Sequence, residues 1–284
     1  MSGAKRQERQ RRVVDIQDLS CVGRCSLAVS LPALGIEVSP LPTALLSTHT
    51  AFPNARRWSL TEEMRGIVSH WEAMSLPVDA VLTGYLGTDG QLPLAAELAR
   101  EYRSRGALVV VDPVMGDNGR LYTGFAPGYA REMAALCGQA DVILPNVTEA
   151  AFLLGEPCLP DAYTLGQATG LLRRLGTLGA KQVVLTGVCD GPDRLGVLTL
   201  DTRTDAEERW FHQRVRAGYP GTGDLFASVF TGLLLGGDPL SKAAAGAAAF
   251  VAECLRRTVA AGTDPRFGVR FEPCLPLLWE RRKM

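Results

Sequence analysis

Residues 107–113 read ALVVVDP and residues 141–146 read DVILPN. Each run is apolar almost throughout and then reaches a polar residue, Asp112 in the first run and Asn146 in the second. Continuous apolar runs of this kind are typical of strands that are buried on both faces of a sheet. We therefore predict that both runs are interior strands of a parallel sheet.

Three further runs of the same character lie outside these two, namely VVDIQ at 13–17, DAVLTG at 79–84 and QVVLTG at 182–187. The segments between the runs show helical spacing, and residues 93–106, PLAAELAREYRSRG, end in a glycine that would stop a helix. This alternation predicts an α/β protein with a doubly wound, mostly parallel central sheet and helices on both faces. Ligands of such sheets bind beyond the carboxyl ends of the strands, so the sequence predicts one cleft there.

The remaining organisation is simple. Residues 195–200 and 209–216 resemble an antiparallel pair that extends or edges the sheet. No internal repeat, low-complexity linker or sharp change in composition divides the chain, so we predict one catalytic domain over residues 13–284. Residues 1–12, MSGAKRQERQRR, are polar and mostly basic, which predicts a disordered tail.

Composition restricts the class of partner. The 284 residues carry 30 lysines and arginines against 30 aspartates and glutamates, so no broad field favours nucleic acid or an anionic membrane. No apolar stretch near the start has the character of a secretion signal or a membrane span. The seven cysteines are odd in number and scattered through apolar segments, unlike a disulfide scaffold, which predicts semi-buried or buried thiols in a reducing cytoplasm. The expected partner is a small molecule.

The strongest local signal is residues 218–237, GYPGTGDLFASVFTGLLLGG, where a glycine-rich turn runs into an apolar helix closed by Gly236 and Gly237. Glycines at positions 221 and 223 allow the backbone to approach a ligand closely. The free N–H groups of the first helical turn then point the positive end of the helix at that ligand. A transferring phosphoryl group would fit there.

Asp224 lies in the first turn of this predicted helix, and its position alone leaves two interpretations open. The side chain could cap the helix or complement its dipole. It could instead accept a proton from a substrate hydroxyl while neighbouring amides stabilise charge on a phosphoryl group. The Walker pattern, which needs a lysine after the glycines, is absent from this segment.

Four further features of the sequence are short motifs: residues 47–50 (STHT), residues 112–117 (DPVMGD), residues 144–146 (LPN) with Glu149, and Gly221-Thr222-Gly223-Asp224. They occur in the order seen in pyridoxal kinases of the ribokinase superfamily, which the chain resembles. The resemblance covers about residues 13–260 and also includes Thr83-Gly84-Tyr85 and the strand that ends at Thr186. The chain is most similar to the bacterial branch described as pyridoxamine or pyridoxal kinases, which implies a ribokinase-like fold.

The resemblance implies roles for these motifs in ATP-dependent phosphorylation of the 5′-hydroxymethyl group of a vitamin B6 vitamer. Asp224 would deprotonate that hydroxyl, while the backbone amides of Gly221, Thr222 and Gly223 hold the transferring phosphoryl group. Asp112 and Asp117 resemble positions that face the ATP phosphates and the cation. Asn146 and Glu149 resemble those that organise Mg²⁺ through water, and Thr186 matches a nucleotide-binding position.

The substrate ring is expected near Thr50 and Tyr85, which match family positions that touch the pyridine. His49 precedes them, and for His49 a structural role and direct substrate contact both remain open. Residues 40–58 are candidates for a lid over the site. The first strand of many pyridoxal kinases ends Ile-Gln-Ser-His, but here residues 16–19 read IQDL, so Asp18 puts a carboxylate where a hydroxyl is usual. We hypothesise that Asp18 favours a cationic or donor-bearing substrate.

Two alternatives remain at this level. Hydroxymethylpyrimidine kinases carry an aspartate comparable to Asp18, although they often have cysteine in place of Asp224. A non-catalytic B6-binding sensor could keep the fold without the reaction, although Asp224 and the glycine turn disfavour it. By resemblance the expected partners are ATP with Mg²⁺, with a monovalent cation left open, a small B6 vitamer and a second copy of the chain in a homodimer.

Overall fold

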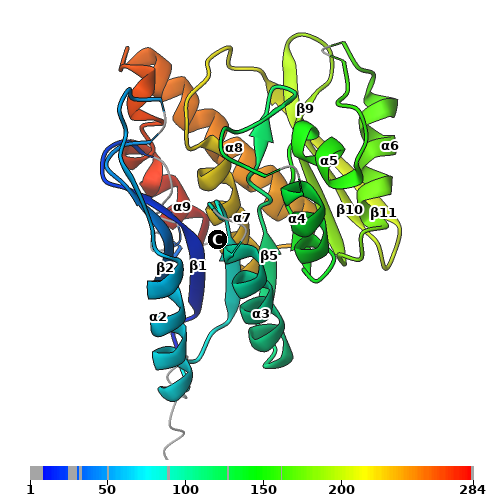
Figure 1. Cartoon of the computed structure of the whole chain (residues 1–284). Coiled ribbons are helices and arrows are strands. Elements are labelled where there is room, and N and C mark those ends of the chain that lie inside the picture. Colours follow the sequence, from blue (N-terminus) through cyan, green and yellow to red (C-terminus); the bar gives the residue numbers. More distant parts are fainter. Residues whose placement is uncertain are drawn as a thin grey trace, which may run out of the picture.

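The computed structural model describes residues 9–24, 31, 34–49, 51–87, 90–126, 128–160 and 162–282. Within these residues nine strands form one sheet in the order β11-β10-β9-β8-β5-β4-β1-β2-β3 (Figure 1). The strands of this sheet are β1 (Arg12–Ser20), β2 (Glu37–Leu46), β3 (Arg57–Ser59), β4 (Ala80–Thr83), β5 (Leu108–Val111), β8 (Val142–Ile143), β9 (Gln182–Cys189), β10 (Arg194–Asp201) and β11 (Ala206–Gln213). A separate hairpin pairs β6 (Gly116–Asp117) with β7 (Arg120–Leu121).

Helices cover both faces of the sheet (Figure 1). One face carries α2 (Thr61–Ala73), α3 (Gln91–Ser104), α4 (Tyr129–Cys137), α5 (Val147–Leu154) and α6 (Leu165–Gly176). The other carries α7 (Thr222–Gly236), α8 (Leu240–Ala260), the 3-10 turns η1 (Pro265–Phe267) and η2 (Glu272–Cys274), and α9 (Leu275–Arg282). None of the helices in the described ranges is both long and apolar enough to cross a membrane.

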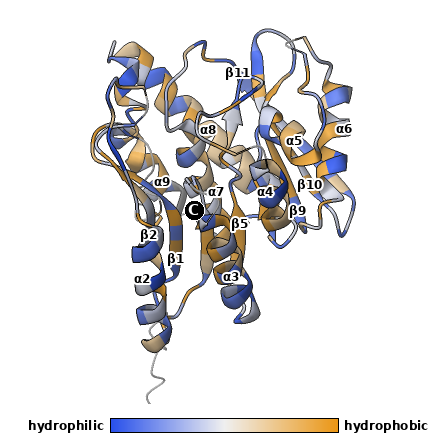
Figure 2. Cartoon of the chain, viewed as in Figure 1, coloured by the Kyte–Doolittle hydropathy of each residue, from blue (hydrophilic) through white to orange (hydrophobic). Residues whose placement is uncertain are grey.

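The core consists of two apolar layers, one on each face of the sheet. Neighbouring residues of a strand alternate between the layers, as in β5, where Val109 and Val111 pack under α3 and Val110 packs toward α7. All three side chains are fully buried. The inner strands are accordingly apolar along most of their length, while the outer surfaces of the helices are hydrophilic (Figure 2). This double burial explains why the strands read as continuous apolar runs.

The structure confirms the predicted class and the five predicted inner strands. β1, β4, β5, β8 and β9 are parallel to their neighbours within this set. β10 is antiparallel to β9 and to β11, as expected for the two predicted edge segments. The second of these lies at residues 206–213 rather than 209–216, because charged residues 207–209 belong to the strand and not to the turn before it.

The prediction of a lid over residues 40–58 is wrong for its first part. β2 occupies residues 37–46 and pairs in parallel with β1, so residues 40–46 belong to the sheet. Pro40 and Pro42 concealed this strand, because proline lacks the N–H that a central strand needs. β3 pairs only with residues 44–46 of β2, so the prolines lie where that edge of β2 has no partner.

The parallel strands end at one edge of the sheet, and α7 begins there. The residues that follow β4, β5 and β8 therefore lie on the same side of the molecule as the glycine turn at residue 221. β2 has one extra residue opposite the interval from Gln17 to Leu19, which places Asp18 at a bulge in the β1–β2 pairing. This edge contains the predicted site.

Candidate active site

The first turn of α7 forms a backbone surface without a side-chain cap. Gly221 is the residue before the helix and has φ +83°, a left-handed conformation that glycine adopts without strain. Because Gly221 has no side chain, it offers no oxygen that could accept hydrogen bonds from the amides of the first turn. Gly223 is exposed, and a Cβ built on it would meet no atom within 4 Å. No side chain therefore caps the first amides of α7, and their binding of a phosphoryl group stays a prediction.

Asp224 lies in this first turn, half-buried, and acts electrostatically on Asp112. Asp112 follows β5, is 7% exposed, and donates its backbone N–H to the Thr83 carbonyl at 3.0 Å. Burial raises the pKa of Asp112 well above its ordinary value, and the charges of Glu149 and Asp224 raise it further. The structure thus brings Asp112, Asp224 and Glu149 into one electrostatic cluster.

Glu149 is fixed by a capping box at the start of α5. The Asn146 side chain accepts a hydrogen bond from the Glu149 N–H, and the Glu149 carboxylate accepts one from the Asn146 N–H, both at 2.9 Å. The other carboxylate oxygen accepts the Met115 N–H at 3.1 Å. The Asn146 side chain also donates to the Gly116 carbonyl at 2.9 Å. Asn146 and Glu149 therefore join the start of α5 to the segment after β5.

Burial is the main electrostatic influence on Glu149 and raises its pKa to about 8. Hydrogen bonds from the backbone N–H groups of Asn146, Met115 and Gly116 oppose this rise, and the charge of Asp117 adds to it. Near neutral pH the cluster consequently favours either a bound proton or a nearby cation.

The β6–β7 hairpin places Asp117 near this cluster. The Asp117 carboxylate accepts hydrogen bonds from the backbone N–H and side-chain amide of Asn118 at 2.8 and 3.0 Å. A Cβ on Gly116 would lie 2.5 Å from the Arg120 carbonyl, so the hairpin needs glycine there. Tyr122 follows the hairpin. Burial raises the pKa of its hydroxyl, and the charges of nearby carboxylates raise it further; these are Glu149, Asp117, Asp112 and Asp224. Sequence reasoning missed Tyr122, because only the hairpin brings it beside the carboxylates.

The carboxylates fit a hard divalent cation that is held mainly by other groups. Among the residues described, no three or more histidine, cysteine, aspartate or glutamate side chains are arranged to hold a metal by themselves. Mg²⁺ commonly keeps several waters and binds through one or two carboxylates plus substrate phosphates. When ionised, the carboxylates of Asp112 and Glu149 repel their acidic neighbours, and a bound cation would neutralise this negative charge.

Thr186 lies beside Asn146 at the same edge. The two residues form an isolated parallel bridge, and the Thr186 N–H donates to the Pro145 carbonyl at 2.9 Å. The Thr186 hydroxyl also donates to that carbonyl at 3.3 Å. Thr186 thus lies in one row with Asp112 and Asn146, but β9 continues past it to Cys189, so the expectation that this strand ends at Thr186 is wrong.

A second group lies at the ends of β1 and β4. Asp18 is 7% exposed, and its charge raises the pKa of Tyr85, for which burial is the largest cause. The Arg57 guanidinium lies 5.5 Å from the centre of the Tyr85 ring, lowers that pKa, and donates to the Gly87 carbonyl at 2.5 Å. Arg57 was not predicted as a site residue, because nothing near it in the sequence indicates that its side chain contacts Tyr85.

His49 has both ring nitrogens bonded to backbone. Nδ1 accepts the Ala51 N–H at 3.2 Å, so the neutral ring carries its proton on Nε2 and donates to the Arg266 carbonyl. The ring also packs edge-to-face on Phe52, with centroids 5.1 Å apart. This geometry favours the structural role of the two left open. Thr50, the neighbouring predicted contact, lies outside the described residues.

The loop after β1 requires glycine at position 23, which yields a stability prediction. Gly23 has φ +99°, and a Cβ there would lie 2.7 Å from the His49 ring. We expect Gly23→Ala to lower the free energy of unfolding by about 2–3 kcal/mol, from left-handed strain plus the clash. The matched control is Gly106→Ala, which has φ +92° but no neighbour within 4 Å. Equal losses for the two variants in urea unfolding would refute the contact between Gly23 and His49.

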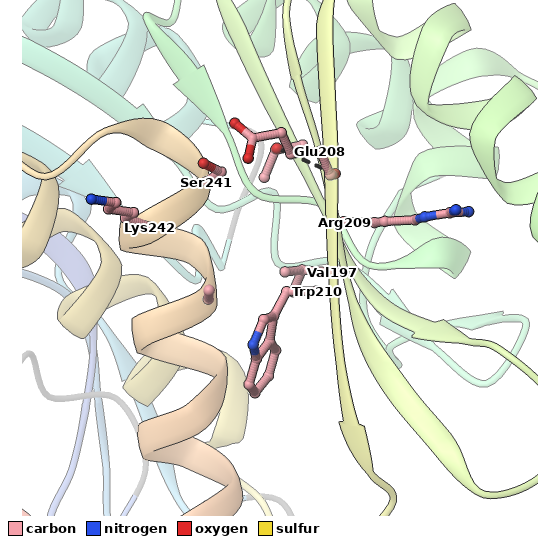
Figure 3. Close-up of a pocket in the computed structure, with 8 residues that line it drawn as sticks. Val197, Glu208, Arg209, Trp210, Ser241 and Lys242 are labelled. Atoms are coloured by element: carbon pink, nitrogen blue, oxygen red, sulfur yellow. Dashed lines mark hydrogen bonds between the residues drawn. The ribbon is translucent and has the colours of Figure 1, made fainter.

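The structure also has a groove between α8 and the outer strands β10 and β11 (Figure 3). On β11, Trp210 lies between the strand and α8 and Glu208 extends toward Ser241, whereas Arg209 points away from the helix (Figure 3). Ser241 and Lys242 belong to the first turn of α8, which starts at the end of the sheet opposite the start of α7. None of the predicted site residues lines this groove, so it is separate from the candidate active site.

Comparison with known proteins is consistent with the geometry of the candidate site. Residues 65–267 match the phosphomethylpyrimidine kinase family. A pyridoxine/pyridoxal/pyridoxamine kinase of Bordetella avium is 30% identical over 257 residues, which cover 87% of this chain and 85% of that protein. The chain belongs to the pyridoxal kinase family. A pyridoxal kinase of Arabidopsis thaliana is also 30% identical, over 89% of this chain and 85% of that protein.

Solved structures of this family and its relatives share the fold closely. A Bacteroides thetaiotaomicron protein, named for phosphomethylpyrimidine kinase and crystallised with pyridoxal, has a TM-score of 0.90 and 38% identity over 95% of this chain and 96% of that one. The pyridoxal kinase of Lactobacillus plantarum has a TM-score of 0.83 and 34% identity, covering 96% of this chain and 98% of that one. The predicted membership in the pyridoxal kinase family and the ribokinase-like α/β fold are confirmed.

Proposed function

We propose that this member of the pyridoxal kinase family transfers the γ-phosphoryl group of ATP to the 5′-hydroxymethyl group of a vitamin B6 vitamer. The observation that carries the proposal is the open amide turn of α7, with Asp224 in electrostatic contact with the buried Asp112 at the carboxyl edge of the sheet. This arrangement offers a base and an anion-binding backbone in one place. The pyridoxal-bound relative supports the choice of substrate class.

In the proposed reaction Asp224 accepts the proton of the substrate hydroxyl as its oxygen attacks the γ-phosphorus. The amides of Gly221, Thr222 and Gly223 stabilise the negative charge on the transferring group, aided by the positive end of α7. Asp112 and Asp117 face the phosphate side of the site. Thr186, which lies in β9 beside Asn146, contacts the nucleotide.

The residues present also fit Mg²⁺ bound with ATP. Glu149 and Asp117 would hold the hydrated ion, with Asn146 keeping the Glu149 carboxylate in place through the capping box. When bound, the ion would neutralise charge on the phosphates. ADP-bound relatives from Leishmania donovani are consistent with nucleotide use by this fold.

On the substrate side we propose that Asp18, Tyr85 and the segment at His49 and Thr50 surround the vitamer ring. Asp18 would accept a charge-assisted hydrogen bond from a protonated ring nitrogen or from the ammonium group of pyridoxamine. Replacing Asp18 with serine would exchange this for a weaker neutral hydrogen bond. Tyr85 supplies an aromatic surface next to Phe125, whose ring centroid is 5.7 Å from its own.

We therefore expect Asp18→Ser to lower the ratio of kcat/KM for pyridoxamine to that for pyridoxal by roughly tenfold, which corresponds to about 1.4 kcal/mol. Steady-state kinetics with both substrates measures this ratio. Asp15→Asn, a change at another buried aspartate of β1, serves as the control because residue 15 lies further from the strand end. An unchanged ratio in Asp18→Ser would exclude the contact with the ammonium group, and unchanged kcat/KM values for both substrates would remove the proposed role.

The decisive test of the reaction is a substrate panel. Purified protein with MgATP would be given pyridoxal, pyridoxamine, pyridoxine or hydroxymethylpyrimidine, and ADP release would be measured. Turnover of a B6 vitamer supports the proposal, whereas turnover of the pyrimidine alone would assign the chain to the activity for which its matched family is named. Binding of a vitamer without any turnover would indicate a sensor. A proposed homodimer and cytoplasmic location need separate tests, the first by light scattering.

A further inference from the structure

Two buried cysteines face each other on the side of the sheet covered by α7 and α8. Cys254 lies in α8 and Cys274 lies in η2, and both side chains are 0% exposed. Their thiols are hydrogen-bonded to each other, and neither takes part in a disulfide. The pair lies outside the proposed kinase site and has no role in the proposed reaction.

Two hydrogen bonds join the backbone segments that carry the pair, after Cys254 in α8 and before Cys274 in the C-terminal segment. The Thr258 hydroxyl donates to the Cys254 carbonyl at 2.6 Å and accepts the Arg270 N–H at 2.9 Å. One turn along α8, the Arg257 guanidinium donates to the Pro273 carbonyl at 3.1 Å, immediately before Cys274. These bonds hold the segment that leads into η2 against α8.

We propose that Cys254 and Cys274 form a reversible disulfide that ties the C-terminal segment, residues 264–282, to α8. Glutathione disulfide is a sufficient oxidant. The Cys274 thiol loses its proton and attacks one sulfur of glutathione disulfide, releasing one glutathione. The Cys254 thiolate then attacks the mixed disulfide at the Cys274 sulfur and releases the second glutathione. Two cysteines are oxidised, one glutathione disulfide is reduced, and both protons end on glutathione.

Oxidation requires the C-terminal segment to open first. Burial raises the pKa of the Cys254 thiol, and the thiolate is the reactive form, so the closed protein resists attack. Cys274 lies on the short terminal segment, whereas Cys254 lies within a 21-residue helix, so opening exposes Cys274 before Cys254. The reaction rate should therefore increase under conditions that loosen residues 264–282 while leaving the sheet folded.

The same C-terminal segment forms hydrogen bonds with the loops that contain Arg24 and His49, so the disulfide should also affect these loops. The Arg266 carbonyl accepts the hydrogen bond from His49, and the Phe267 carbonyl accepts the Arg24 N–H at 3.1 Å. Tying η2 to α8 limits how far these two carbonyls can move. Oxidation should therefore reduce the local opening of residues 21–24 and 47–49.

The test uses the full-length protein incubated with glutathione disulfide in increasing urea below the unfolding midpoint. We expect a product lighter by two hydrogen atoms, a 254–274 linkage in non-reducing peptide maps, and a Tm about 5 °C above that of the reduced protein. Dithiothreitol should reverse all three. Cys274→Ser should abolish the product, whereas Cys137→Ser, at another fully buried cysteine, should retain it.

Hydrogen exchange of the wild-type protein provides a readout that does not depend on how the variants fold. Peptides covering residues 21–24 and 47–49 should exchange more slowly after oxidation than before it. Failure to form the linkage at any urea concentration, linkage to a different cysteine, or an unchanged Tm after complete linkage would each overturn the proposal. Linkage without slower exchange in these peptides would overturn the proposed effect on the loops.

Discussion

Asp224→Ala is expected to lower kcat by about 10²–10⁴-fold, because it removes the group that we propose takes the proton of the substrate hydroxyl. Asp224 lies in the first turn of α7 and interacts with the buried Asp112, so the substitution also removes one negative charge from the cluster. Binding of MgATP should therefore be preserved or slightly strengthened. ADP release in the presence of a B6 vitamer and calorimetric titration with MgATP measure the two effects separately.

The control is Asp238→Ala, at an acidic residue just beyond the other end of the same helix. This variant should retain activity within about twofold, since its position is remote from the reacting groups. Loss of activity in Asp224→Ala together with loss of MgATP binding would contradict a role as base and would indicate a role in forming the anion site.

The apo protein is expected to lose stability as the pH rises, because burial raises the pKa of Glu149 to about 8 from an ordinary value of 4.5. The folded protein then binds more protons than the unfolded chain between these two values. The contribution of this group is therefore fully present below about pH 4.5 and is lost as the pH rises toward about 8. We expect a loss on the order of 3 kcal/mol between pH 5 and pH 8.

Urea unfolding at a series of pH values, in EDTA and without nucleotide, measures this loss. Glu149→Gln should have a flatter dependence on pH, whereas Glu132→Gln, at an exposed position of α4, should follow the wild type. Adding MgATP should restore stability at pH 8, because a cation then compensates the charge of the cluster. Parallel pH profiles for Glu149→Gln and the wild type would show that Glu149 is not the group responsible.

The fold was predictable where a strand is buried on both faces. The run at 107–113 became β5, whose residues alternate between two apolar layers and leave no polar position to interrupt the run. β2 was not predictable, because two prolines are acceptable only when a neighbouring strand leaves that edge unpaired, and this depends on the short length of β3. The sequence of residues 37–46 does not reveal that the neighbouring strand β3 is short.

The candidate site was predictable where residues follow strand ends or form a local motif. Asn146 and Glu149 are three residues apart and form a capping box, which such spacing favours. Tyr122 and Arg57 join the site through a hairpin and an edge strand, so sequence distance hides them. His49 was recognised, but its hydrogen bond to Arg266 spans 217 positions, and no local pattern indicates that both ring nitrogens are already used.

That long-range bond sets an order of events during synthesis. The loop at His49 leaves the ribosome early, but the carbonyl that fixes it belongs to a residue 217 positions later. At typical translation speeds of about 5–20 residues per second, the loop waits roughly 10–40 s for its anchor. The chain can therefore assemble most of its sheet while the loop at His49 is still without this bond, and a polypeptide truncated before residue 266 would be unable to form it.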